Sequence, residues 1–127
     1  SVNRSIYAYT KLHDGTIRNR RLFKEFDKSD GNPDGLTIDS EGYVWVAHWG
    51  GGKVSRLSRR GVVEFVLDIP ALQVTNCIFG GPKMNLLFVS TAARNVSNQE
   101  NSPAGSVFYI EASVTGPQPC RYDGSRL

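Results

Sequence analysis

The sequence predicts an all-β chain, and three of its features support that prediction. Apolar and polar residues alternate with a period of two along short runs such as Lys53–Leu57, as they do in strands with one buried face. Turn-forming Gly, Asp and Pro residues separate these runs. No stretch combines a helical apolar period with capping residues.

The expected strands follow one another closely along the chain. Two of them flank the turn at Asp14-Gly15, at residues 6–9 and 21–23. Each of the others is a short run of β-branched, aromatic or alternating residues that is bounded by a turn signal. These runs cover residues 36–38, 43–47, 53–57, 62–67, two strands within 75–92, and 104–112.

The strands also recur in a fixed order, which indicates an internal repeat. Residues 34–58, DGLTIDSEGYVWVAHWGGGKVSRLS, read as a short strand, a Gly turn, a strong strand and a third strand after a Gly run. Residues 75–112 repeat that order with a longer insertion, so that Asp34 corresponds to Thr75. A period of roughly 40 to 50 residues with four short strands is typical of propeller blades. We therefore predict a partial β-propeller.

Four strands per blade divide the chain unevenly within one domain, residues 1–127. We expect residues 1–28 to form the outer two strands of one blade, and residues 34–67 to form a complete blade. Residues 73–112 then form the inner three strands of the next blade, and the tail at 113–127 is a candidate for its fourth. Because a propeller ring closes only with more blades, and an open strand edge invites pairing, the chain is expected to be part of a larger propeller or one subunit of a ring assembled from several chains.

Composition limits the class of protein. With 39% hydrophobic and 21% charged residues, the chain has no apolar run near the roughly 20 residues that span a bilayer, so no membrane partner is expected. The basic clusters at 18–21 and 56–60 lie beside turns and read as solvated strand and turn surface, so no nucleic-acid partner is expected. Cys77 and Cys120 share no metal-ligand spacing. Together with the lack of a recognisable signal segment, this favours a cytoplasmic protein with two free thiols over one with a disulfide.

Motifs over residues 1–112 resemble the C-terminal half of the SMP-30/gluconolactonase family, which includes regucalcin and luciferin-regenerating enzyme. The matching segments are SVNRSIYAYT, IRNRRLF, NPDGLTIDSEGYVWVAHWGGGKVSRL, TNCIFGGP with LFVSTAAR, and PAGSVFYI. The resemblance implies a six-bladed β-propeller with one divalent metal, Ca, Zn, Mg or Mn, in its central channel. It also implies hydrolysis of sugar lactones or related esters.

The resemblance assigns the central role to Asp34. In the family, the aspartate of the PDG motif is a metal ligand and the proposed general base, and we expect Asp34 to precede the innermost strand of its blade and point into the channel mouth. The family takes its further ligands from a glutamate in the first blade and an asparagine about midway, and this chain has no residue that matches either. Because a hard divalent cation takes six or more oxygen ligands, metal occupancy is doubtful in the isolated chain, which we expect to be inactive.

Other candidate site residues flank the two innermost strands. We predict that His48 lies at an exposed loop mouth, where a surface role and a substrate contact remain open. Trp49 is a candidate substrate contact, whereas Trp45 is expected to pack between blades. Asn76, or its neighbour Thr75, either packs within its strand or lines the channel and contacts substrate.

The sequence leaves different classes of function open. One is a lactone or ester hydrolase whose site is completed by a homo-oligomer or by a missing N-terminal half. The alternative is a non-catalytic half-propeller that acts as a weak calcium-binding, small-molecule-binding or structural module.

Overall fold

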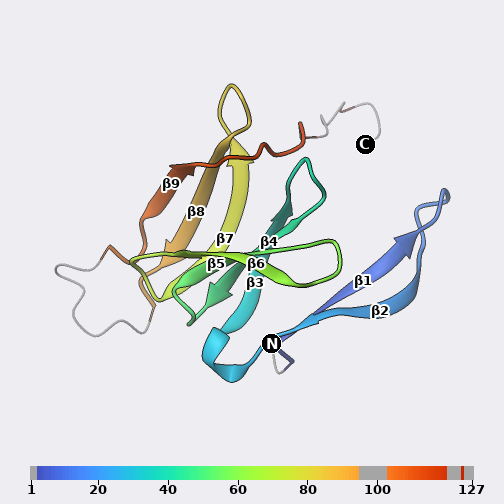
Figure 1. The fold of residues 1–127 in the computed structure, drawn as a ribbon, viewed down its shortest axis with the longest axis horizontal. Coiled ribbons are helices and arrows are strands. Elements are labelled where there is room, and N and C mark those ends of the chain that lie inside the picture. The colour runs from blue at the N-terminus through green and yellow to red at the C-terminus, as the bar shows by residue number, and fades with distance from the viewer. Residues whose placement is uncertain (1–2, 95–102, 120–123, 125–127) are drawn as a thin grey trace.

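The computed structural model describes residues 3–94, 103–119 and 124, and these residues confirm the all-β class (Figure 1). A short 3₁₀ turn, η1 Lys28–Asp30, lies ahead of the third strand. The strands are β1 Ser5–Lys11, β2 Ile17–Glu25, β3 Asn32–Ile38, β4 Val44–Trp49, β5 Lys53–Leu57, β6 Val63–Asp68, β7 Gln73–Gly80, β8 Leu86–Ala92 and β9 Val107–Glu111.

The strands form a two-stranded sheet and a strongly curled larger one. β1 and β2 pair as an antiparallel hairpin that stands apart from the rest of the molecule (Figure 1). In the larger sheet the order is β6-β5-β4-β7-β8-β9, with β3 paired to β4. β4 and β7 pair only through Trp49 and Gln73. This narrow link divides the sheet into a four-stranded unit, β3–β6, and a three-stranded unit, β7–β9.

The main hydrophobic core lies between these two units. Trp45, Ala47 and Val54 from the first pack against buried side chains of the second, which include Cys77, Phe79, Leu87 and Val89. Trp45 is 3% exposed, and its ring meets that of Phe79 edge-on with centroids 5.6 Å apart, so the prediction that Trp45 packs between blades is confirmed. Each such apolar side chain contributes roughly 1.5–3 kcal/mol when it is fully buried.

The opposite face of the four-stranded unit is covered in part by the hairpin. Phe26 packs with Val46 and Leu57 there, and Ile6, Phe23 and Val44 add partly buried contacts. β4 is therefore buried on both faces, because Trp45 and Ala47 point toward one sheet while Val46 and His48 point toward the other.

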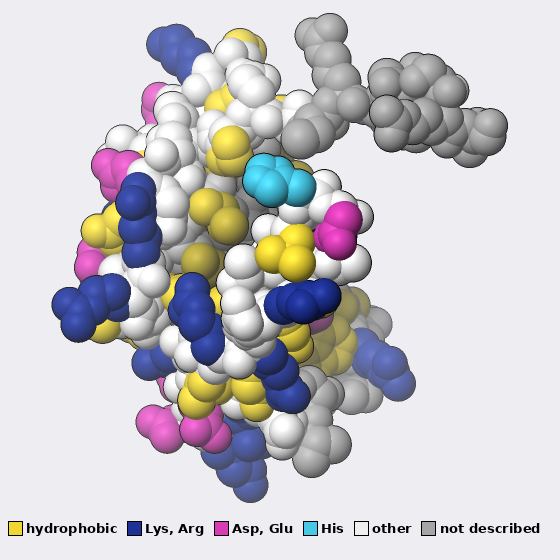
Figure 2. Space-filling model, turned by 90° about the vertical axis from the view of Figure 1, so that its right-hand side faces the viewer, with side chains coloured by type: hydrophobic (Ala, Val, Ile, Leu, Met, Phe, Trp, Pro, Cys, Tyr) yellow, Lys and Arg dark blue, Asp and Glu magenta, His cyan; other side chains and the backbone are white. Residues whose placement is uncertain are grey.

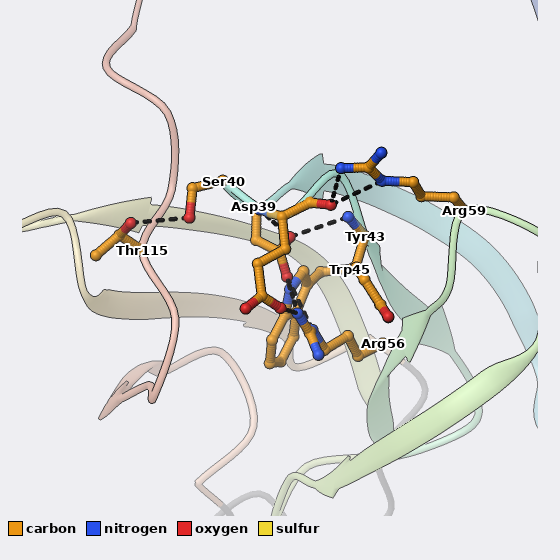
Figure 3. Close-up of polar contacts among 8 residues, drawn as sticks. Asp39, Ser40, Tyr43, Trp45, Arg56, Arg59 and Thr115 are labelled. Atoms are coloured by element: carbon orange, nitrogen blue, oxygen red, sulfur yellow. Dashed lines mark hydrogen bonds and ion pairs between the residues drawn. The ribbon is translucent and has the colours of Figure 1, made fainter.

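A buried aspartate joins the strands of the four-stranded unit (Figure 3). Oδ1 of Asp39 accepts hydrogen bonds from the backbone N–H groups of Glu41, at 3.0 Å, and Tyr43, at 2.9 Å. Its Oδ2 accepts from Trp45 Nε1 at 2.9 Å and from Arg56 Nε at 2.8 Å. The carboxylate thus fixes the turn after β3 to side chains of both β4 and β5.

The described part of the tail does not form the fourth strand that was a candidate at 113–127. Instead it crosses the end of the β7–β8 hairpin, where the Gly116 N–H donates to the Met84 carbonyl at 2.8 Å. Thr115 then reaches the four-stranded unit: its carbonyl accepts from the Ser40 N–H at 2.8 Å and its hydroxyl lies 3.0 Å from that of Ser40 (Figure 3). The tail straps the two units together and leaves the edge of β9 uncovered by residues 112–119.

No helix in the described ranges is long and apolar enough to cross a membrane.

Candidate functional site

Asp34 lies within the innermost strand of the four-stranded unit. It was expected just before that strand, but β3 already begins at Asn32. The pairing of β3 with β4 shifts between Pro33 and Leu36, so Asp34 and Gly35 form an irregularity of the kind that re-aims side chains near active sites. The Asp34 side chain is exposed, as a carboxylate that takes part in binding must be.

Gly35 brings Asn76 against this irregularity. A Cβ on residue 35 would lie 2.5 Å from Cγ and 2.7 Å from Cα of Asn76, distances that real side chains do not adopt. Only glycine therefore allows β7 to approach β3 so closely at this level. The structure thus places Asn76 beside the Asp34-Gly35 segment, on the innermost strand of the neighbouring unit.

The position of Asn76 is fixed by its own strand. The pairing of β7 with β8 shifts between Val74 and Asn76, so a second irregularity faces the first. The Oδ1 of Asn76 accepts a hydrogen bond from the Cys77 N–H at 2.9 Å. Thr75, by contrast, lies toward β8, with its hydroxyl 2.8 Å from that of Ser90 and donating to the Ser90 carbonyl at 3.0 Å. Of the two residues, Asn76 is the exposed one.

His48 is buried, which corrects the expectation that it lies at an exposed mouth. Its exposed fraction is 0%, and its ring packs edge-on against Phe26 with centroids 4.8 Å apart. The triple glycine after β4 signals a turn, but the hairpin covers this side of the strand before the turn begins. Neither ring nitrogen has a hydrogen-bond partner in the described part of the chain, and a substrate contact through His48 does not fit this position.

The burial of His48 predicts a loss of stability in mild acid. Burial lowers the pKa of His48 below its ordinary value of 6.5, and the neighbouring Lys53 charge adds to the effect, against an opposing influence of Asp30. As the pH falls below about 6.5, the unfolded chain takes up the proton first, so the free energy of unfolding should decrease from there down to the folded pKa. Urea titrations at about pH 7.5 and about pH 5.5 measure this difference.

Two variants separate His48 from other groups in that experiment. His48→Leu keeps an apolar ring-sized side chain beside Phe26 and should reduce the loss between the two pH values. His13→Gln, in the exposed hairpin turn, should retain it. A loss of the same size in His48→Leu would show that other groups cause it.

Trp49 ends β4 at the junction of the two units. It is half-buried and pairs with Asn32 of β3 on one side and Gln73 of β7 on the other. Trp49 therefore lies at the same end of the innermost strands as the start of β3, and its exposed portion can form part of the rim of a site around Asp34.

Cys77 points away from this site, into the core between the units. Its thiol is free and buried, and burial raises its pKa to about 12. A thiol with so high a pKa is protonated and inert near neutral pH. Cys120 lies outside the described residues.

The donor groups of one chain do not fit a divalent cation. Asp34 offers a carboxylate, and the amide oxygen of Asn76 offers one further lone pair beyond its bond to Cys77. Calcium takes six to eight oxygen ligands, and zinc takes three or four protein ligands. In the described ranges, His, Cys, Asp and Glu side chains do not gather in groups of three or more that could hold a metal.

Sequence reasoning missed two residues that shape the site. Gly35 was treated only as a turn residue, because its contact is with a strand 41 positions further along the chain. Asp39 was noticed only as part of a motif. The spacing of Asp39 from Glu41, Tyr43 and Trp45 is the signal that could have revealed it, since an aspartate two and four residues before backbone N–H groups is a turn-capping arrangement.

Comparison with known proteins identifies relatives of this arrangement. The family model described as the SMP-30/Gluconolactonase/LRE-like region matches residues 1–93. The pentonolactonase XacC of Haloferax volcanii is 33% identical over 128 aligned residues, which cover 94% of this chain and 44% of that protein.

Solved structures show the same likeness. A luciferin-regenerating enzyme superimposes with a TM-score of 0.80 and 30% identity over 91% of this chain and 41% of its own. Regucalcin from Agrobacterium tumefaciens, described as a calcium-binding protein, gives a TM-score of 0.71 and 28% identity over 78% of this chain and 35% of its own. These neighbours are propellers of the SMP-30 type, which confirms the expected partial propeller. The chain spans less than half the length of each of these relatives.

Proposed function

The chain belongs to the SMP-30/gluconolactonase/LRE-like family, and from this we propose that it forms the C-terminal part of a hydrolase that acts on sugar lactones or related esters. The observation that supports this best is the contact between Gly35 and Asn76. It brings the exposed carboxylate of Asp34 and the amide of Asn76 to one place on two neighbouring innermost strands. A carboxylate next to a neutral hydrogen-bonding group is the minimum that ester hydrolysis by an activated water needs.

In the proposed reaction Asp34 acts as the general base. Its carboxylate accepts a proton from a water molecule, whose oxygen then attacks the lactone carbonyl carbon. The ring C–O bond breaks, and the proton returns to the departing alcohol oxygen, so that the product is a hydroxy acid. The amide N–H groups of Asn76 bind a polar oxygen of the substrate, and the exposed part of Trp49 covers an apolar face of the sugar ring.

The proposal includes a divalent cation of the kind for which the Agrobacterium regucalcin is described. Asp34 is its ligand from this chain. Because the donor set of one chain is too small to hold a cation, we assign no step to it. The remaining ligands must come from another polypeptide, either a homo-oligomer or an N-terminal half.

Hydrolysis of an aldonolactone by the purified chain tests this function. Acid release should rise above the uncatalysed rate when Ca, Zn, Mg or Mn is added, and it should fall again with a chelator. A chain that binds one of these cations without hydrolysing lactones or simple esters would instead be a non-catalytic binding module. That result would overturn the proposed activity.

A further inference from the structure

Two apolar faces of the chain are open, one at each end of the strand order. The head face lies in a groove of about 210 Å³ between the β1–β2 hairpin and the four-stranded unit, where Leu36 and Ile38 are 47% and 49% exposed. The tail face is the side of the β7–β9 unit that points away from the main core. There, Ile78, Val107 and Tyr109 are 58–68% exposed beside a second groove of about 140 Å³.

Each face is bordered by an unpaired strand edge. β9 pairs with β8, and β1 pairs with β2, and the described residues supply neither strand with a partner on its other side. In Figure 1 the two strands lie at opposite ends of the molecule. Open edges of this kind favour pairing with another chain.

We infer that the occupant of both faces is a second copy of this chain, bound head to tail. The β7–β9 unit of one copy fits the head groove of the other, where its tail face covers Leu36 and Ile38 and the free edge of β9 pairs with the free edge of β1. One contact thus closes two open edges and buries two apolar faces. Repeated by a two-fold axis, it closes a ring of four sheets, within the four to eight blades that propellers have.

The charges of the two surfaces are compatible with this pairing. The hairpin strands carry the basic residues Lys11, Arg18, Arg20, Arg21 and Lys24, and Figure 2 shows Lys and Arg scattered over the hairpin's side of the molecule. The strands β7, β8 and β9 contain one charged residue, Glu111, which is acidic. A basic surface therefore meets one with no positive charge of its own, which favours the encounter.

The ring would bring two copies of the candidate site to one channel. Two Asp34 carboxylates and two Asn76 amide oxygens then face the same axis, a donor set that suits a hard cation better than the one in a single chain. This consequence for the site rests on the proposed function, whereas the association itself does not.

The native mass of the chain, measured by light scattering over a wide range of concentrations, tests the association. We expect twice the 14.0 kDa of one chain. Ile38→Lys blocks the head face and Tyr109→Lys blocks the tail face, and each variant alone should give a monomer, because both contacts need an intact head and an intact tail. Val62→Lys, an equally exposed apolar residue in the turn between β5 and β6, is the matched control and should stay dimeric.

A mixture of the two blocked variants distinguishes this arrangement from other dimers. Tyr109→Lys retains an intact head and Ile38→Lys an intact tail, so the mixture should form a heterodimer through one remaining contact, weaker than the natural dimer. Circular dichroism shows whether each variant keeps its strands. If one does not, Leu36→Lys or Val107→Lys replaces it on the same face.

Three outcomes would overturn the inference. They are a 14.0 kDa monomer at every concentration, a dimer that neither blocked variant disrupts, or a ladder of open oligomers in place of a closed pair. Lactone hydrolysis plays no part in these measurements, so their failure and the failure of the proposed activity are separate results.

Discussion

Asp34→Asn is expected to lower kcat/KM for lactone hydrolysis by about 10²–10⁴-fold, the usual contribution of a general base. The substitution keeps the size of the side chain and the β3 irregularity around it, but an amide does not accept the proton of the attacking water. Activity assays with the added cation, alongside a cation titration of the variant, measure the effect.

Asp14→Asn is the control for this substitution. Asp14 is an exposed aspartate in the turn of the β1–β2 hairpin, and its replacement should leave kcat/KM unchanged. Equal urea midpoints of the wild type and Asp34→Asn would exclude unfolding as the cause of the loss. If Asp34→Asn retained full activity, the general-base assignment would be wrong.

Asp39→Ala is expected to destabilise the chain by about 3–5 kcal/mol, the typical cost of removing one partner of a buried ion pair. Burial alone would raise the pKa of Asp39, but the hydrogen bonds from Trp45, the Tyr43 N–H and Arg56, with the Arg56 charge, hold it below its usual range. Without the carboxylate, the buried Trp45 Nε1 loses its acceptor. Arg56 keeps only Glu41 as an acidic partner.

Urea unfolding measures this loss. Asp68→Ala, at the exposed end of β6, is the matched control and should shift the midpoint little, since exposed charges contribute about 0–1 kcal/mol. A similar small shift in Asp39→Ala would mean that the network does not hold the blade together.

The strands could be predicted from the sequence because their signals are local. The alternation of Lys53–Leu57 and the β-branched and aromatic run before it need no knowledge of the rest of the fold. Asp34 was placed within two residues of its position in β3 for the same reason, since Pro33 and Gly35 mark the irregularity.

Long-range contacts explain what the sequence did not predict. His48 is buried because Phe26, from the segment after β2, covers the second face of β4, and a strand that is buried on both faces gives no alternation from which exposure can be read. The closeness of Gly35 and Asn76 depends on how two units pack. The path of the tail depends on a hydrogen bond between Thr115 and Ser40, which are 75 residues apart.

The central claim is that Asp34 belongs to a site that a second copy of the chain completes. Calorimetric titration of the purified chain with a divalent cation tests it most directly. We predict one ion bound for every two chains, and no binding by Asp34→Asn. One ion per chain, or binding that Asp34→Asn leaves unchanged, would contradict the claim.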